Sequence, residues 1–139
     1  MIKMMLCCGG GFSSSYVAQR MQKEICQENL ENEVMIEFSP FTLMQERINE
    51  FDIILCCPHL YVYVKQLCQQ EVLNKPLYVL PPRMYGKMEI LEIYQDAKDI
   101  IEIFQQTHQN PVHFPGEENI LRVTRLHSYR HMYQNKKHL

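Results

Sequence analysis

Four short apolar runs along the chain predict the strands of a β-sheet. The first, "IKMMLCC" over residues 2–8, and the third, "DIILCC" over residues 52–57, are almost wholly apolar. Such runs are typical of strands that are buried on both faces of a sheet. The other two runs are "VMIEF" over residues 34–38 and "LYVL" over residues 77–80. Pro76 at the start of the fourth run, with a proline pair after it, favours an edge position for that strand.

Apolar residues between these runs recur at the spacing of amphipathic helices. The clearest stripe predicts a helix over residues 89–106 and consists of Ile90, Tyr94, Ala97, Ile101 and Phe104. Three further helices are predicted over residues 14–30, 42–48 and 60–73.

Strands that alternate with helices of this length form β-α-β units, which give a parallel sheet with helices on both faces. The first and third strands are the most apolar, so we place them side by side at the centre. The predicted fold is α/β, with a four-stranded parallel sheet in the order 2-1-3-4. Winding reverses between strands 1 and 3, and such sheets bind ligands at the carboxyl ends of the strands at that point. Residues 9–15 follow strand 1 there.

The segment 108–139 differs in composition from the rest of the chain. It holds five of the six histidines, and five Lys/Arg against two Glu. We therefore divide the chain into a domain over residues 1–107 and a basic, His-rich C-terminal extension over residues 108–139. A further helix is expected from Glu117 onward, with Ile120, Val123 and Leu126 on one side. The extension is either a solvated, loosely docked tail or a docking surface for a partner.

Composition limits the function classes. A chain of 139 residues with 46% hydrophobic content fits one core. The formal net charge of -2, without a run of Lys or Arg, argues against nucleic-acid binding. No apolar run approaches the ~20 residues that span a bilayer, so no membrane insertion is expected. Without an export signal, we expect a cytoplasmic protein whose six cysteines are reduced thiols.

The loop after the first strand, "CCGGGFSSS", carries the chemistry. A strand that turns directly into a helix leaves backbone N–H groups unpaired at the helix start, and glycines open them to a ligand. The predicted anion cradle consists of Gly9, Gly10, Gly11, Phe12, Ser13, Ser14 and Ser15. Cys8 lies at its base, where the same field favours a nucleophilic thiolate. The loop matches neither a nucleotide P-loop, which needs Lys after Gly11, nor the dinucleotide fingerprint, which needs Gly at position 14.

This loop resembles the C-x-x-G-[MF]-S-[ST]-S active-site loop of enzyme IIB from the lactose/cellobiose-type bacterial sugar phosphotransferase system. The similarity continues in "DIILCCPHL", "NKPLYVL" and "MYGKME", and covers about residues 2–106. The resemblance implies a phosphocarrier without cofactor or metal. In that family, enzyme IIA donates phosphate from a phosphohistidine, and the membrane permease IIC presents the sugar that receives it. By position, Cys8 becomes the phosphocysteine, and Cys7 points to the opposite face of the strand.

Five residues are candidates for the rim of this site. Cys57 stands where the family commonly has glycine, and Pro58 follows it. His59 either approaches the phosphate or is a surface residue. Tyr85 lines the site or its docking rim, and Lys87 does the same or is a solvated charge. The family also commonly has an acidic residue near the prolines at 81 and 82.

Other chemistries fit the sequence less well. The layout is similar to that of low-molecular-weight tyrosine phosphatases, but their C-x5-R signature needs Arg at position 14, where this chain has Ser. A degenerate, binding-only IIB-like domain is the other alternative. A metal site is not expected at the paired cysteines, because adjacent residues on a strand point apart. Cys8 and Cys57 are expected to lie close enough for a reversible disulfide.

Overall fold

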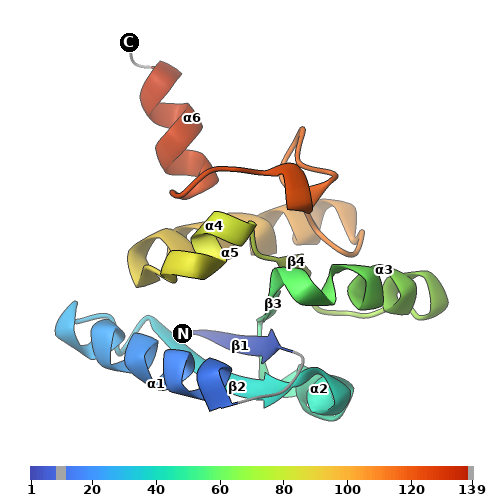
Figure 1. Ribbon diagram of the computed structural model, residues 1–139, viewed down its shortest axis with the longest axis horizontal. Coiled ribbons are helices and arrows are strands. Elements are labelled where there is room, and N and C mark those ends of the chain that lie inside the picture. Colours follow the sequence, from blue (N-terminus) through green and yellow to red (C-terminus); the bar gives the residue numbers. More distant parts are fainter. Residues whose placement is uncertain (9–11, 138–139) are drawn as a thin grey trace.

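Four parallel strands form one sheet in the order β2-β1-β3-β4 (Figure 1). The computed structural model describes residues 1–8 and 12–137, with side chains described for residues 1–8 and 15–133. The strands are β1 (Ile2–Cys8), β2 (Val34–Pro40), β3 (Ile53–Cys56) and β4 (Leu77–Val79). The predicted α/β class, strand order and parallel sense are all confirmed, and β4 is an edge strand, as expected.

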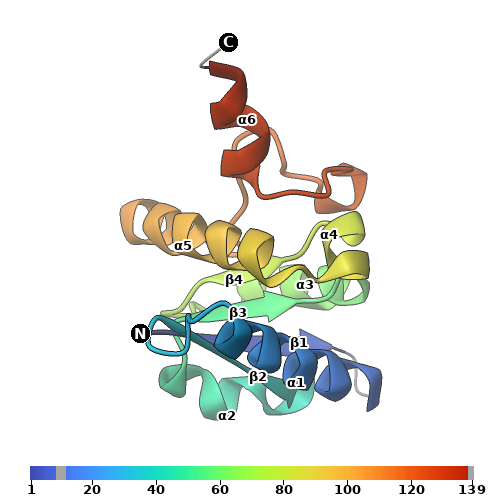
Figure 2. The same cartoon turned by 90° about the vertical axis from the view of Figure 1, so that its left-hand side faces the viewer.

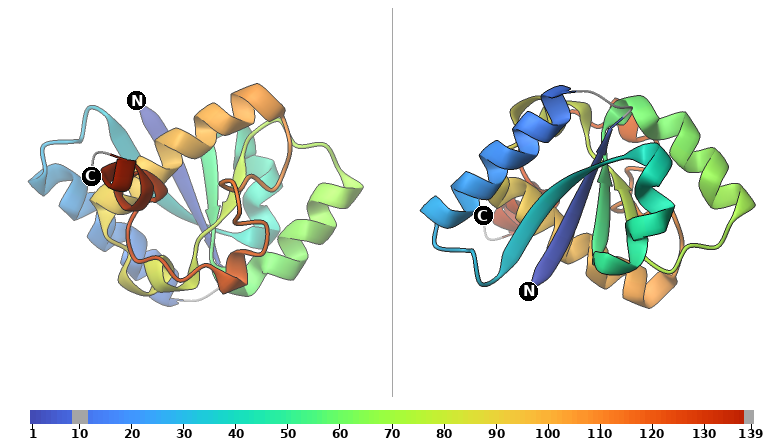
Figure 3. Two further views of the ribbon diagram at one scale, coloured as in Figure 1. Left: turned by 90° about the horizontal axis from the view of Figure 1, so that it is seen from above. Right: turned by 90° about the horizontal axis from the view of Figure 1, so that it is seen from below.

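Helices cover both faces of the sheet, as predicted (Figure 3). One face carries α1 (Phe12–Gln27) and α5 (Ile90–Thr107), and its core includes the fully buried Leu6 and Met21. The other face carries α2 (Met44–Arg47) and α3 (Tyr61–Gln70), and its core includes Met5 and Val64. Met5 and Leu6 are neighbours on β1 that point to opposite faces, which is why the strand is apolar at almost every position.

The helices differ in detail from the sequence expectation. α1 begins two residues earlier and ends at Gln27, because Asn29 adopts a left-handed conformation with φ 58°. α3 is shorter than expected and follows a 3-10 turn over Pro58–Leu60. The short helix α4 (Pro82–Lys87) was not predicted; it starts directly after β4 with a proline in its first turn.

The C-terminal extension wraps over the open edge of β4. Val112 N–H donates to Leu77 O at 2.9 Å, and Leu77 N–H donates to Asn110 Oδ1 at 2.9 Å, so part of the edge of β4 is hydrogen-bonded. Phe114 is buried in the core on the α1/α5 face, whereas Ile120 is buried on the α2/α3 face. Covering an edge strand in this way prevents it from pairing with another chain.

The structure corrects the expectation for the helix of this extension. The predicted helix from Glu117 is wrong: residues Ile120–Arg122 form a single 3-10 turn, and helix α6 spans Tyr129–Lys137. Ser128 marks its start, since its hydroxyl accepts a hydrogen bond from His131 N–H at 3.1 Å. α6 projects from the body of the molecule above α5 (Figures 1 and 2).

A buried ionic network joins the extension to the sheet and to α5. The Arg125 guanidinium donates to Asp96 Oδ2 at 2.8 Å, to Tyr78 Oη at 2.8 Å, and to both carboxylate oxygens of Glu117 at 2.8 and 3.0 Å. The Arg125 side chain is 3% exposed and that of Asp96 is 0% exposed. The extension is therefore packed onto the domain rather than solvated, over the residues whose side chains are described. The division of the chain into a domain over residues 1–107 and an extension over residues 108–139 stays a prediction.

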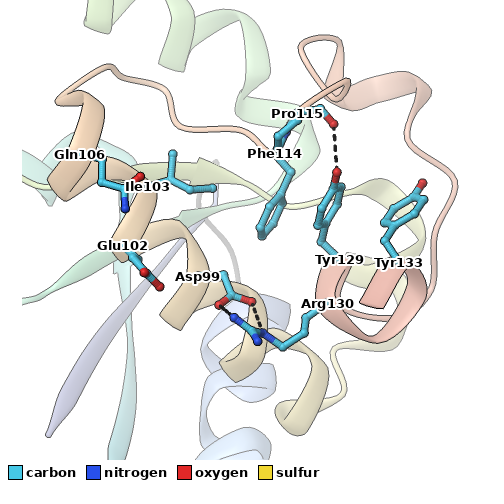
Figure 4. A pocket seen from close by; sticks show the side chains of 9 residues that line it. All are labelled: Asp99, Glu102, Ile103, Gln106, Phe114, Pro115, Tyr129, Arg130 and Tyr133. Carbon is cyan, nitrogen blue, oxygen red and sulfur yellow. Dashed lines mark hydrogen bonds and ion pairs between the residues drawn. The ribbon is translucent and has the colours of Figure 1, made fainter. Parts of the chain in front are cut away.

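Two further contacts hold α6 against the rest of the chain. Arg130 of α6 forms an ion pair with Asp99 of α5 at 2.9 Å, and Tyr129 stacks in parallel on Phe114 with ring centroids 4.4 Å apart (Figure 4). These side chains line a cavity of about 520 Å³ between the two helices. Among the described residues, no helix combines the length and apolar character needed to cross a membrane.

Candidate functional site

Cys8 is the last residue of β1, at the carboxyl edge of the sheet. It pairs with Pro40 of β2, while Cys7 before it pairs with Ser39 of β2 and Cys56 of β3. The helix α1 begins at Phe12, so a connection of three residues separates the cysteine from a helix of 16 residues. The partial positive charge at the start of such a helix favours an anion there.

The predicted cradle is only partly described. Gly9, Gly10 and Gly11 lie outside the described residues. Phe12, Ser13 and Ser14 form the first turn of α1, and their side chains lie outside the described part of the chain. The half-buried Ser15 side chain lines a hollow of about 350 Å³ between α1 and β2, together with Gln22 and Phe38.

Tyr85 of α4 is brought to Cys8 across the carboxyl edge of the sheet. Its hydroxyl lies 3.4 Å from Cys8 Sγ, and either group can donate the hydrogen bond. The exposed His59 ring packs edge-on against Tyr85, with centroids 6.3 Å apart and planes at 75°. Side chains that follow β3 and β4 thus gather beside the end of β1 at the carboxyl edge, as expected where the winding of a parallel sheet reverses.

The other rim candidates differ in burial, from buried to exposed. Cys57 is buried, belongs to the same apolar cluster as Cys8, and donates its N–H to Cys7 O at 3.0 Å. Pro58 is half-buried at the start of the 3-10 turn after β3. Lys87 is exposed at the end of α4, where its carbonyl accepts a hydrogen bond from Arg20 of α1 at 3.5 Å.

The electrostatic environment disfavours other cysteines as nucleophiles. The pKa of the Cys7 thiol is raised from 9.0 to about 12, mainly by burial and also by the nearby Cys8, while the positive charge of Arg47 opposes the shift. The Cys7 Sγ instead lies 3.4 Å from Met5 Sδ, on the face of β1 opposite Leu6. Burial also raises the pKa of Cys56 well above 9.0 and that of Cys68 to about 11. These three thiols stay protonated at neutral pH, and a protonated thiol is a poor nucleophile.

Cys8 is only slightly more exposed to solvent than the neighbouring cysteines. Cys8 retains 5% of its surface, whereas Cys7 and Cys56 are 0% exposed. None of the six cysteines, all of which lie among the described residues, forms a disulfide.

The family model for the lactose/cellobiose-specific IIB subunit of the PTS system matches residues 3–96. The chain belongs to this family. The matched region contains Cys8, the loop after it, His59 and Tyr85, and it ends within α5. Residues of the C-terminal extension lie beyond it.

Two solved structures resemble the IIB fold of this chain. One is the solution structure of the cellobiose-specific phosphotransferase IIB component from Borrelia burgdorferi, at 23% identity and a TM-score of 0.56, covering 73% of this chain and 93% of that one. The other is the lactose-specific IIB component domain from Streptococcus pneumoniae, at 14% identity and a TM-score of 0.46, covering 78% of this chain and 98% of that one. The first of these supports the fold assignment made from the sheet order.

As a IIB domain, the chain is a phosphoryl relay component of the sugar phosphotransferase system. Membership implies phosphotransferase activity in sugar transport, within a system that also contains IIA and IIC partners. The candidate site combines a strand-end cysteine, a short connection to a helix start, and a tyrosine hydroxyl 3.4 Å from the sulfur.

Two groups of residues outside the candidate site were not predicted from the sequence. The Arg125 network went unnoticed because nothing in the sequence marks one arginine among five Lys/Arg of the extension as buried. The cluster of Glu92, His127 and His131 joins residues of α5 to the start of α6. The spacing of four residues between the two histidines was the available signal, but it does not reveal Glu92 as their partner.

Proposed function

We propose that this IIB domain carries a phosphoryl group as phosphocysteine on Cys8. It takes the group from a phosphohistidine of enzyme IIA in the cytoplasm and passes it to a sugar held by the membrane permease IIC. The observation that carries the proposal is the position of Cys8, at the end of the central strand and 3.4 Å from Tyr85 Oη, inside the region that matches the family model.

Each transfer exchanges one bond to phosphorus for another. In the first, the Cys8 thiolate attacks phosphorus, the S–P bond forms, and the N–P bond to the donor histidine breaks. In the second, a sugar hydroxyl attacks, the O–P bond forms as its proton leaves, and the S–P bond breaks to regenerate the thiolate. Such displacements depend on in-line positioning and on stabilising charge on the equatorial oxygens.

The residues around Cys8 have separate parts in this proposal. Backbone N–H groups over residues 9–15 cradle the phosphate oxygens, helped by the positive end of α1. The Tyr85 hydroxyl donates a hydrogen bond to the thiolate, or to a phosphate oxygen once the group has arrived. His59 orients Tyr85 through the edge-on ring contact. Cys57 and Pro58 shape the wall below them, and the exposed Lys87 lies on the side of α4 that faces α1.

A label-transfer experiment tests the proposal. Enzyme IIA carrying radiolabelled phosphate is mixed with the full chain, with Cys8→Ser, and with Cys26→Ser, whose cysteine is exposed near the end of α1. The proposal expects rapid labelling of the unaltered chain and of Cys26→Ser, and none of Cys8→Ser. Addition of membranes containing IIC and the sugar then moves the label from the chain to the sugar.

The same experiment separates a binding-only domain from a carrier. A degenerate IIB-like domain forms a complex with IIA but acquires no label. Undiminished labelling of Cys8→Ser places the acceptor elsewhere in the chain. Either result rejects the proposal.

A further inference from the structure

Three potential metal ligands meet where the C-terminal extension returns to α5. Glu92, in the first turn of α5, accepts hydrogen bonds on one carboxylate oxygen from both His127 Nδ1, at 2.9 Å, and His131 Nδ1, at 2.6 Å. Its other oxygen accepts the Ser128 N–H at 3.1 Å. Both imidazole rings therefore contact one oxygen of the Glu92 carboxylate, while its other oxygen is hydrogen-bonded to the backbone between the two histidines.

The spacing of these atoms suits a single ion. One ligand atom from each residue lies within 4.8 Å of the others. Ligands at about 2.0–2.1 Å from a tetrahedral Zn²⁺ ion are separated from one another by roughly 3.3 Å. The two imidazole rings already lie with centroids 4.6 Å apart and planes tilted by 43°. Small side-chain rotations therefore bring the three donors to coordination distance without moving either helix.

The donor set also has the chemistry of a transition-metal site. Two imidazoles and one carboxylate suit Zn²⁺ and neighbouring divalent ions, whereas Mg²⁺ and Ca²⁺ prefer oxygen ligands throughout. The histidine side chains are 43% and 49% exposed and that of Glu92 is 15% exposed. The ion has an open path from solvent, and water can complete its coordination.

The surroundings fix the ligands in place. Ser128 holds the start of α6 through its hydroxyl, which accepts the N–H of His131 itself. On the same turn of α6, the Arg130 guanidinium is paired with Asp99 of α5 at 2.9 Å (Figure 4). Buried Asp96 accepts the Tyr129 N–H at 2.8 Å, which anchors the backbone between the two histidines.

From this geometry we infer that Glu92, His127 and His131 bind a divalent transition-metal ion of the Zn²⁺ class, which fastens α6 to α5. The sequence analysis expected no metal, on the grounds of the paired cysteines and the family resemblance. It did not weigh these three residues, because only the fold brings Glu92 to the two histidines. The site lies on the extension side of α5, apart from Cys8, and does not depend on the proposed phosphoryl relay. Its role is to tie the C-terminal extension to the domain.

A titration of the full chain with CoCl₂ tests the inference. Bound Co²⁺ reports its ligands in the visible spectrum, and thiolate ligands add a separate charge-transfer band. The inference predicts a site without that band, and an affinity that falls at least about tenfold in His131→Ala and in Glu92→Gln, since even outer-shell substitutions weaken metal sites by about 10–100-fold. His108→Asn is the matched control: it removes an exposed histidine and keeps a residue that tolerates the left-handed φ of 54°.

Amide hydrogen exchange provides a second readout. Metal binding is expected to slow exchange at Ser128 and across the first turn of α6 in the unaltered chain and in His108→Asn, but not in His131→Ala. Circular dichroism verifies that each variant is folded. Undetectable Co²⁺ binding, equal affinity in all variants, a thiolate band, or unchanged exchange in α6 would each overturn the inference.

Discussion

Cys8 Sγ and Tyr85 Oη lie 3.4 Å apart although 77 residues separate them in the chain. The contact exists because β1 and β4 end at the same edge of the sheet and α4 starts directly after β4. It places a polarised O–H beside the sulfur that we propose as phosphate acceptor. The contact joins the central strand of the IIB fold to a helix that the sequence analysis did not foresee.

Replacing Tyr85 with phenylalanine is expected to slow phosphoryl transfer to Cys8 by about tenfold or more. A hydrogen bond to a charged group contributes about 1.5–3 kcal/mol, and the ring itself stays in place in this variant. The rate of label transfer from phosphorylated IIA measures the effect. Tyr63→Phe is the control, because Tyr63 is 61% exposed on α3. Equal rates in Tyr85→Phe and Tyr63→Phe would show that the Tyr85 hydroxyl does not assist the transfer.

Cys8 and Cys57 are expected to form a disulfide under mild oxidation. Cys7 pairs with Cys56 in the sheet, so the residue after each lies at the same level of neighbouring strands, about 5 Å apart. Diamide supplies the oxidant: it takes up the two electrons and two protons that the thiols release. Peptide mass spectrometry should find the linked pair, and phosphate acceptance should stop and then recover with dithiothreitol.

The Cys57→Ser variant provides the control for this disulfide. It should keep its phosphate acceptance after diamide treatment. Loss of acceptance in Cys57→Ser as well, or a Cys8 peptide linked to a different cysteine, would contradict the expected pairing.

Cys7 is expected to lower the free energy of unfolding as the pH rises above 9. Its pKa is about 12 in the folded chain, against 9.0 for an ordinary thiol, so above pH 9 the unfolded chain releases this proton and the folded chain keeps it. The free energy of unfolding should then fall with rising pH, by up to about 1.4 kcal/mol per pH unit from this thiol. Urea denaturation across this range should give a shallower fall for Cys7→Ala than for the exposed-site control Cys26→Ala. Equal slopes would contradict the assignment.

Arg125 is expected to be essential for the packing of the C-terminal extension. Arg125→Met leaves the buried carboxylates of Asp96 and Glu117 without their shared cation, and breaking such a pair costs about 3–5 kcal/mol. Arg122→Met, at an exposed position nearby, should change stability by less than about 0.5 kcal/mol. Urea denaturation of the two variants measures the difference. Similar stabilities would mean that the network does not hold the extension.

The sheet was predictable from the sequence because each strand carries a strong local signal. The apolar runs ending at Cys8 and Cys57 marked the two central strands, and the prolines around β4 marked an edge. The loop composition pointed to Cys8 in the same way, because glycines and serines between a strand and a helix are typical of an anion-binding loop. The rim candidates Cys57 and Tyr85 were predicted from the family resemblance and not from a local pattern.

The extension was less predictable because its stability comes from distant partners. Ile120 and Val123 pack against the α2/α3 face, so their helix-like spacing reflects a segment that wraps over an edge rather than an amphipathic helix. Arg125 is charged yet buried, and its pairing with the distant Asp96 and with Glu117 explains that. Ser128 was a usable helix-start signal, but the apolar spacing upstream of it was more conspicuous.

The most direct test of the account is to locate the phosphate after the chain has reacted with phosphorylated IIA. Tandem mass spectrometry of the digested chain, kept under conditions that preserve S-phosphate, should place the added phosphate on Cys8. Cys7 next to it and Cys57 on the neighbouring loop should be unmodified. A phosphate found on Cys57, on His59 or on another histidine, with Cys8 unmodified, would contradict the account.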